Sequence, residues 1–172
     1  MLKILDNRLS TTIILLMSGK AGSVIELKNK KAYHEYQIED KFEAGVVLCG
    51  TEVKSIRVGK AQVTDGFVRI EKGNAILYNT YIEEYAFGNT SNHNPQRPRQ
   101  LLLHKREIRK LKQAVDTAGY SIVLLKMYFK GPRVKVEIGL GKGKKAQDKR
   151  GDIKKRIALQ EAERALKRFQ HG

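Results

Sequence analysis

The chain has 172 residues, of which 41% are apolar, enough for one domain with its own hydrophobic core. Its 34 Lys and Arg residues against 18 Asp and Glu residues give a net charge of +16, which favours a polyanionic partner, nucleic acid first of all. Cys49 is the only cysteine, which excludes disulfides within the chain and thiolate metal clusters and indicates a reducing, cytoplasmic location.

Two segments hold most of the excess positive charge. Residues 92–112 contain seven Lys and Arg residues and one Glu, and residues 142–172 contain eleven Lys and Arg residues against four acidic ones. A charge run usually means a solvated face. Such concentration instead favours two surfaces that bind a polyanion.

The first 31 residues are expected to form a flexible extension. The apolar run at residues 11–16 is too short to span a membrane, and no small-residue cleavage site follows it, so neither a membrane partner nor a signal peptide is expected. We expect Met17 to be the natural start, with residues 1–16 upstream of it. Residues 18–31 have little periodicity and are typical of a mobile arm.

Strand patterns begin just after residue 32. Residues 34–40 alternate in the period of two of a half-buried strand, and residues 43–49 are apolar on both faces. The pattern then predicts a short helix over residues 51–58 that ends at Gly59. Residues 67–71 and 75–82 follow as two strands of a hairpin, joined by a turn containing Gly73.

An irregular segment at residues 85–100 separates this half of the chain from the next. Pro98 forbids a central strand there, and a long loop in a compact domain is more often functional than idle. A short strand at residues 101–103 precedes a predicted helix at residues 104–118. The apolar stripe of this helix is expected to contain Ile108, Leu111, Val115 and Ala118, with the basic side chains off the stripe.

The clearest hairpin follows, with strands at residues 120–129 and 133–140. We therefore expect a mainly β fold with added helices: an antiparallel barrel of the oligonucleotide-binding type over residues 32–141, with a flexible basic tail at residues 142–172. A β-sandwich built from the same strands is the alternative. The sequence shows no internal repeat. We expect a monomer.

The junction between barrel and tail has the sequence GLGKGKKAQDKR, residues 139–150. It resembles a phosphate-binding loop, but the Ser or Thr that must follow Gly-Lys is absent. Gly139, Gly141 and Gly143 are instead expected to release the chain from the barrel. The helical spacing of apolar residues from Ile153 to Phe169 predicts a tail that is disordered when free and helical when bound.

Catalytic chemistry was considered and is not favoured. Several carboxylates near His34 suggest a metal-dependent nuclease, but Glu35 and Glu39 alternate outward along the predicted strand and do not converge. The four His residues lack zinc-ligand spacing. We expect no catalytic residue, metal or cofactor. Basic and stackable side chains around the long loop, Arg97, Arg99 and His104, favour binding to single-stranded or looped RNA.

Four ordered stretches resemble one family: NKKAYHEY (29–36), EAGVVLCGTEVKSIRVGKA (43–61), RQLLLHKREI (99–108) and GKGKKAQDKR (141–150). Together they resemble the small protein B family, from about Val24 to the C-terminus. The resemblance implies a barrel that binds the tRNA-like domain of transfer-messenger RNA (tmRNA, or SsrA) and delivers it to stalled ribosomes. It also implies a tail that occupies the empty mRNA channel and the decoding centre of 16S rRNA.

The expected RNA contacts combine the resemblance with the basic residues of the loop and helix: Glu43, Arg97, Arg99, Leu102, His104, Lys105, Arg106 and Arg109. The expected ribosome contacts lie in the tail: Lys142, Lys144, Lys145, Gln147, Asp148, Lys149, Arg150, Lys154, Lys155 and Arg156. Because phosphate repels a carboxylate, Glu43 is assigned to a base edge.

The chain departs from the family pattern at two positions. Gln147 stands where many members have an aromatic residue or His, and Ala158 stands where some have a large aromatic. Stacking contacts at these two positions are therefore not expected. A ribosomal or ribosome-assembly protein that binds rRNA is the main alternative function, with the nuclease less favoured.

Overall fold

The computed structural model describes residues 25–88 and 92–145, together with positions 148, 151, 157, 158, 161 and 162. The expectations for residues 1–16, for Met17 as the start, and for Gln147, Lys149, Arg150, Lys154, Lys155 and Arg156 lie outside the described residues. The elements in chain order are β1 (Glu26–Lys28), α2 (Lys30–Glu35), β2 (Tyr36–Val46), α3 (Gly50–Arg57), β3 (Ala61–Gln62), β4 (Phe67–Glu71), β5 (Asn74–Tyr78), β6 (Tyr81–Ile82), β7 (Arg99–Leu102), α4 (Lys105–Ala118), β8 (Ser121–Lys130) and β9 (Arg133–Gly143).

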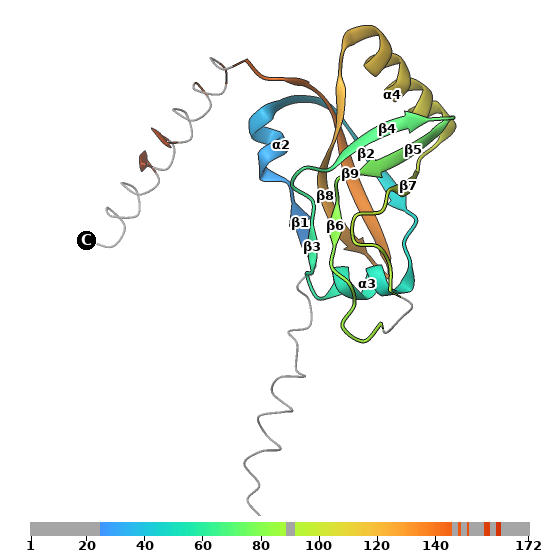
Figure 1. Cartoon of the computed structure of the whole chain (residues 1–172). Helices are drawn as coiled ribbons and strands as arrows, with labels where there is room; N and C mark the ends of the chain where they lie inside the picture. The colour runs from blue at the N-terminus through green and yellow to red at the C-terminus, as the bar shows by residue number, and fades with distance from the viewer. Residues whose placement is uncertain are drawn as a thin grey trace, which may run out of the picture.

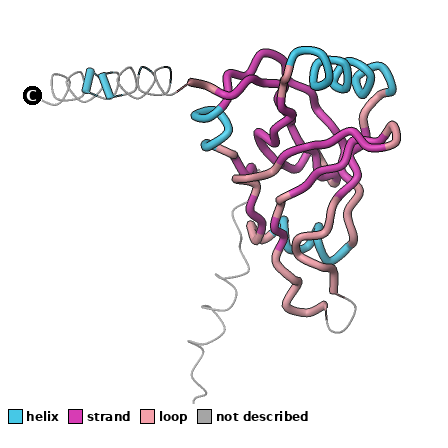
Figure 2. Tube along the Cα trace, turned by 45° about the horizontal axis from the view of Figure 1, so that its top comes forward, coloured by secondary structure: helices cyan, strands magenta, loops and turns pink. Residues whose placement is uncertain are grey.

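The main sheet closes on itself as an antiparallel ring. Its strands pair in the order β8, β4, β5, β7, β2 and β9, and β9 pairs back onto β8. One half of β8 pairs with β4 while the other half pairs with β1, which adds an outer strand to the ring. Figures 1 and 2 show this strand body with α3 at one end and α4 near the opposite end. The mainly β, antiparallel fold class is confirmed, and the closed pairing does not fit a sandwich.

The core fills the ring with inward-facing side chains. In β9, the buried side chains are Val134, Val136, Ile138 and Leu140. Arg133, Lys135 and Glu137 alternate with them and face outward, as the pattern predicts. Each fully buried side chain of this kind contributes about 1.5 to 3 kcal/mol relative to exposure. This burial fixes the register of the strand, because a slip by one residue would turn every apolar side chain outward.

The segment before β2 differs from the expectation. Residues 26–28 pair with β8, and Lys30–Glu35 is a helix where the sequence predicts an arm and then the start of a strand. The helix forms because Asn29 caps it: its side-chain oxygen accepts from the backbone N–H of Ala32 at 3.0 Å. The same amide donates to the Leu124 carbonyl at 2.8 Å and ties the helix to β8.

The glycine-rich junction also differs from the expectation. Gly139 and Gly141 are buried inside β9, and pairing with β2 continues as far as Gly143 opposite Tyr36. Beyond the strand, the Lys144 N–H donates to the Glu35 carbonyl at 2.8 Å. The glycines therefore do not release the chain at residue 139 or 141. They allow β9 to lie tightly against its neighbours, because a Cβ on Gly141 would lie 2.7 Å from the Gln37 carbonyl oxygen.

Helix α4 confirms the predicted helix, with Gly119 ending it in the left-handed conformation at φ +64°. Leu111 is fully buried and Ala114 packs on the core, whereas Val115 and Ala118 are exposed. The apolar stripe is therefore narrower than predicted at the C-terminal end. The helix contacts β4 and β8 through this stripe and leaves its basic side chains outside.

Candidate RNA interface

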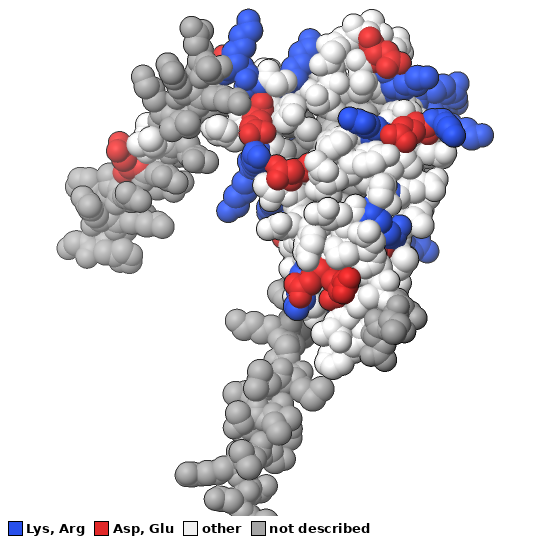
Figure 3. Space-filling view, viewed as in Figure 1, with Lys and Arg blue, Asp and Glu red and all other residues white. Residues whose placement is uncertain are grey.

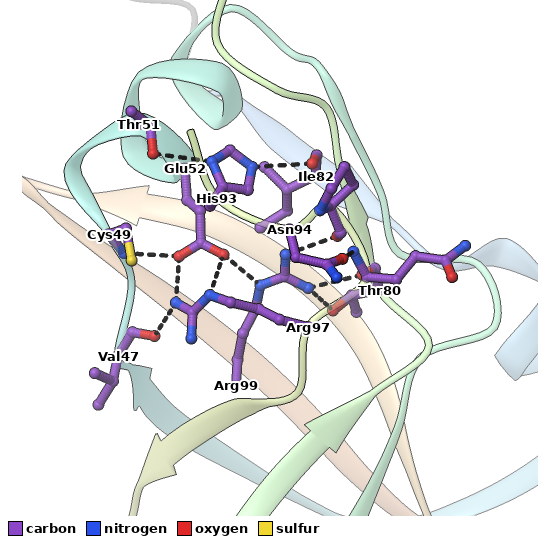
Figure 4. Close-up of polar contacts among 12 residues, drawn as sticks. Val47, Cys49, Thr51, Glu52, Thr80, Ile82, His93, Asn94, Arg97 and Arg99 are labelled. Carbon is purple, nitrogen blue, oxygen red and sulfur yellow. Dashed lines mark hydrogen bonds and ion pairs between the residues drawn. The ribbon is translucent and has the colours of Figure 1, made fainter. Parts of the chain in front are cut away.

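A buried carboxylate organises the loop that precedes β7. Glu52 of α3 is fully buried and accepts from Arg97 at 2.5 and 3.0 Å and from Arg99 at 2.9 Å. It also accepts from the Cys49 N–H at 2.7 Å and so closes the first turn of its own helix. Figure 4 shows the carboxylate between the two guanidinium groups. This network fastens residues 94–99 to α3.

Electrostatics keep this carboxylate charged. Burial alone raises the pKa of Glu52, but the hydrogen bonds from Arg97, Cys49 and Arg99 outweigh it and hold the pKa below its ordinary value. Arg99 is fully buried and also donates to the Thr80 carbonyl at 2.7 Å and the Pro95 carbonyl at 2.8 Å. Each of the three guanidinium nitrogens of Arg99 thus donates to a partner inside the protein.

The sequence predicts that the two loop arginines, Arg97 and Arg99, contact RNA. In the structure, both guanidinium groups instead bond to other parts of the protein. Arg99 has no exposed surface, so it cannot reach an RNA phosphate in this conformation. Arg97 is partly exposed, but its guanidinium is engaged by Glu52 and the Val47 carbonyl. His93, also buried, bonds Thr51 at 2.9 Å and the Ile82 carbonyl at 3.1 Å. Their shared role is to hold the loop.

Glu43 lies on the outer face of the ring, surrounded by donors. One carboxylate oxygen accepts from the Tyr128 hydroxyl, the other accepts from Lys130 Nζ at 3.0 Å, and Lys135 Nζ lies 3.8 Å away. The Tyr128 and Lys130 bonds lower the pKa of Glu43. Burial and the bond to Glu43 raise the pKa of Tyr128 to about 12. The carboxylate is therefore ionised, and the two lysines make the local charge positive.

Leu102 lies next to Glu43 on the same outer face. Its partner across the β2–β7 pair is Gly45, which shares the outer face of β2 with Glu43. The Leu102 side chain is 58% exposed and packs over Gly45, where a Cβ would lie 3.3 Å from it. The structure thus brings together two of the predicted RNA contacts that lie 59 positions apart in the sequence.

A hollow of about 380 Å³ opens beside Leu102. Its walls are mostly apolar, and its rim contains Arg133 and Lys135 from the β8–β9 hairpin. Lys135 links the hollow to Glu43, because it lines the former and lies near the latter. The sequence pattern places Arg133 and Lys135 on the outer face of a strand, but it does not reveal the pairing of Lys135 with Gly45 of β2, which brings Lys135 to within 3.8 Å of Glu43.

His104 and the first residues of α4 continue this surface. His104 is the N-cap of α4, and its N–H donates to Glu107 at 2.8 Å. Lys105, Arg106 and Arg109 are exposed, at the helix end where backbone N–H groups favour an anion. Figure 3 shows Lys and Arg side chains gathered around α4 and the tip of the β4–β5 hairpin. The predicted RNA contacts other than Arg97 and Arg99 all lie on the outside of the ring.

The predicted tail contacts that fall in the described residues begin close to α2. Lys142 Nζ lies 4.6 Å from the centre of the Tyr120 ring, and Lys144 Nζ donates to the Tyr33 carbonyl at 3.0 Å. The Lys145 N–H donates to Asp148 at 3.3 Å. Positions 148, 151, 157, 158, 161 and 162 have helical backbone.

A larger hollow, of about 550 Å³, lies elsewhere, among α2, β4, α4 and β8. Its lining includes four carboxylates, Glu35, Asp65, Glu71 and Asp116, against Arg69 and Lys112, so its charge does not suit RNA. In the part of the chain that the structure describes, no three His, Cys, Asp or Glu side chains converge as a metal site requires. The described helices are too short or too polar to cross a membrane.

Comparisons with known proteins agree with the resemblance in the sequence. The model of the SmpB protein family matches residues 26–168. The SsrA-binding protein of Geotalea uraniireducens (strain Rf4) is 55% identical over 139 residues, covering 81% of this chain and 92% of the relative. That of Shouchella clausii (strain KSM-K16) is 54% identical over 151 residues, covering 88% and 96%. A solved chain described under "tmRNA-SmpB: a journey to the center of the bacterial ribosome" is 46% identical with a TM-score of 0.60, covering 71% of this chain and 86% of that one.

Proposed function

This chain belongs to the SmpB family, and from that premise we propose that it binds the tRNA-like domain of tmRNA and delivers it to stalled ribosomes. It works in the cytoplasm as an RNA-binding factor and not as a catalyst. Relatives that are more than 50% identical over most of their length are named SsrA-binding proteins, and SsrA is tmRNA. A chain with 46% identity belongs to a structure described for tmRNA, SmpB and the ribosome together.

One observation in this molecule supports the proposal most directly: Glu43 and Leu102 are adjacent on the outside of the ring, with Lys130, Arg133 and Lys135 around them. A carboxylate on an RNA-binding face is unfavourable unless its charge is compensated. Here two lysines compensate it, so phosphate can approach. We assign the RNA contacts of the ring to Glu43, Leu102, His104, Lys105, Arg106 and Arg109, and leave Arg97 and Arg99 to the loop.

The tail has the second role in this proposal. Asp148, Lys149 and Arg150 reach the decoding centre of 16S rRNA, and the basic residues from Lys142 to Arg156 follow the empty mRNA channel. Gln147 and Ala158 lack the aromatic groups of other members, so the tail relies on charge and on the helix more than on stacking. The β9 strand ends at Gly143, which sets where the tail leaves the ring.

The test is a binding measurement with the purified full-length protein. We expect it to bind an in vitro transcribed tRNA-like domain of tmRNA more tightly than a tRNA or 5S rRNA of similar length. About six phosphate contacts predict a slope of about −4 to −5 when the logarithm of the association constant is plotted against the logarithm of the salt concentration. Equal affinity for all three RNAs would favour the ribosomal-protein alternative, and a flat salt response would exclude the basic surfaces as the interface.

A further inference from the structure

The hollow beside Leu102 has the properties of a binding site, and Leu102 is the one RNA contact named so far that lines it. Its lining includes Gly45, Leu48, Val53 and Leu102, none of them charged. Its rim has the exposed cation Arg133 and the half-buried cation Lys135. Volumes of about 300 Å³ and more are typical of pockets that accept a small planar molecule.

The side chains around the hollow suit a nucleobase and its phosphate. An unstacked nucleobase has two apolar faces and a polar edge, and its own phosphate follows at one side. Apolar walls suit the faces, and Arg133 and Lys135 suit the phosphate. Glu43 is an acceptor close to this hollow, because it lies 3.8 Å from Lys135 Nζ. Acceptors for base amino and imino groups are what a carboxylate supplies in nucleic-acid recognition.

We propose that this hollow receives one unpaired base of the bound RNA, with the base against Leu102 and its 5′ or 3′ phosphate on Arg133 and Lys135. The proposal rests on the proposed function, because it names a subsite within the same interface. Tyr128 and Lys130 are positioning residues for it, since they hold both oxygens of Glu43 in place. The absence of a side chain at Gly45 leaves room for Leu102 in this position, because a Cβ there would lie 3.3 Å from the Leu102 side chain.

The larger hollow does not compete for this base. It carries more carboxylates than cations around its lining, so a phosphate would be repelled there. The Leu102 hollow, in contrast, has Arg133 and Lys135 in its lining and no carboxylate. Lys135 and Lys130 outnumber the one nearby carboxylate, Glu43. Charge complementarity therefore places RNA at the smaller hollow.

The experiment combines an abasic scan of the RNA with variants of the full-length protein. Each unpaired nucleotide of the tRNA-like domain is made abasic in turn, and the Kd is measured by fluorescence anisotropy. Base stacking on protein is worth about 1 to 3 kcal/mol, and the lower end applies to an aliphatic wall. We expect one position at which removal of the base weakens binding to the unchanged protein by about 5- to 10-fold.

The protein variants then locate that base. In Leu102→Ala, we expect weaker binding to the intact RNA and less than about 2-fold further loss at the same abasic position, because the two changes remove one contact. Val58→Ala is the matched control: Val58 is 62% exposed but does not line the hollow, and the full abasic effect should persist. Arg133→Gln should reduce the magnitude of the salt slope by about 0.7 to 0.9.

Three outcomes overturn the proposal. In the first, removal of each base weakens RNA binding by the same factor in Leu102→Ala as in the unchanged protein. In the second, no base removal weakens RNA binding to the unchanged protein. Leu102→Ala could also leave RNA affinity intact and weaken ribosome association, which would give the hollow to a protein partner. Failure of the unchanged protein to prefer the tRNA-like domain would instead overturn the proposed function itself, so the two failures are distinguishable.

Discussion

At the scale of single residues, the most consequential group is the buried carboxylate of Glu52. A buried ion pair gains little overall, because desolvation of the charges offsets their attraction, but removal of one partner leaves the other charge buried and unpaired. Here two arginines depend on one carboxylate, and Arg99 is fully buried. The pair therefore specifies which conformation the loop adopts more than it raises the stability of the fold.

Glu52→Gln is predicted to reduce the free energy of unfolding by about 3 kcal/mol at neutral pH, because Arg99 loses its charge partner inside the protein. Urea unfolding followed by circular dichroism measures this. Glu83→Gln is the control: it removes a carboxylate that pairs with Lys60 on the surface, and its cost should stay below about 1 kcal/mol. Equal effects of the two variants would contradict the role assigned to Glu52.

The same carboxylate predicts a pH dependence. Because the folded state lowers the pKa of Glu52 below its ordinary 4.5, the stability that it contributes is complete above pH 4.5 and is lost as the pH falls through the lowered value. The difference in unfolding free energy between the unchanged protein and Glu52→Gln should therefore shrink as the pH is lowered below 4.5. Unfolding curves measured from neutral to acidic pH test this, and a constant difference would refute it.

Tyr128 gives a spectroscopic test of the Glu43 cluster. Its pKa of about 12 arises from burial and from the hydrogen bond to Glu43. Glu43→Gln should lower that pKa toward 10.0 but leave it above, since burial remains. Alkaline titration of tyrosinate absorbance, with Tyr128→Phe subtracted to isolate one tyrosine of the seven, measures the shift. An unchanged pKa would mean that the two side chains do not interact in solution.

At the scale of elements, the sequence predicts features that come from a periodic pattern within one segment. It does not predict features that depend on contacts between distant segments. The alternation in β9 and the spacing in α4 are properties of a single segment, so both elements were predictable. The positions of Arg99 and Lys135 were not, because a basic residue is the same letter whether it meets a buried Glu52 or the solvent. Asn29 is a residue type that favours an N-cap, but it lies within residues 18–31, which the sequence predicts to be a mobile arm.

The glycines near the end of β9 test the corrected view of the junction. Gly141→Ala is predicted to destabilise the protein by about 1 to 3 kcal/mol, because its Cβ would lie 2.7 Å from the Gln37 carbonyl oxygen in the strand pair that closes the ring. Gly143→Ala is the matched control, since nothing lies within 4 Å of its Cβ. Urea unfolding compares the two. A flexible junction at both glycines would instead make the two variants equal.

At the scale of the whole molecule, the two proposed RNA surfaces lie on separate parts of the chain. The ring has an outer face with Glu43, Leu102 and the start of α4, all positioned by sheet pairing and helix packing. The tail begins beyond the last paired residue, Gly143, on the side of α2, where Lys144 bonds to Tyr33. A division of labour follows in the proposed function: the ring holds tmRNA, and the tail senses the empty ribosome.

Truncation after Lys145 separates these roles without cutting into β9. The shortened protein keeps every described strand pair and the Lys144 bonds to α2, so we expect it to bind the tRNA-like domain within about 3-fold of the full chain, a difference of less than about 1 kcal/mol. Peptide tagging on stalled ribosomes should be lost, because the residues assigned to the decoding centre are gone.

A truncation after Leu140 is the contrasting variant: it removes the Gly141 to Gly143 pairing with β2 and should weaken folding and RNA binding together. Parallel loss of binding and tagging in the Lys145 truncation would show that the tail belongs to the tmRNA interface itself.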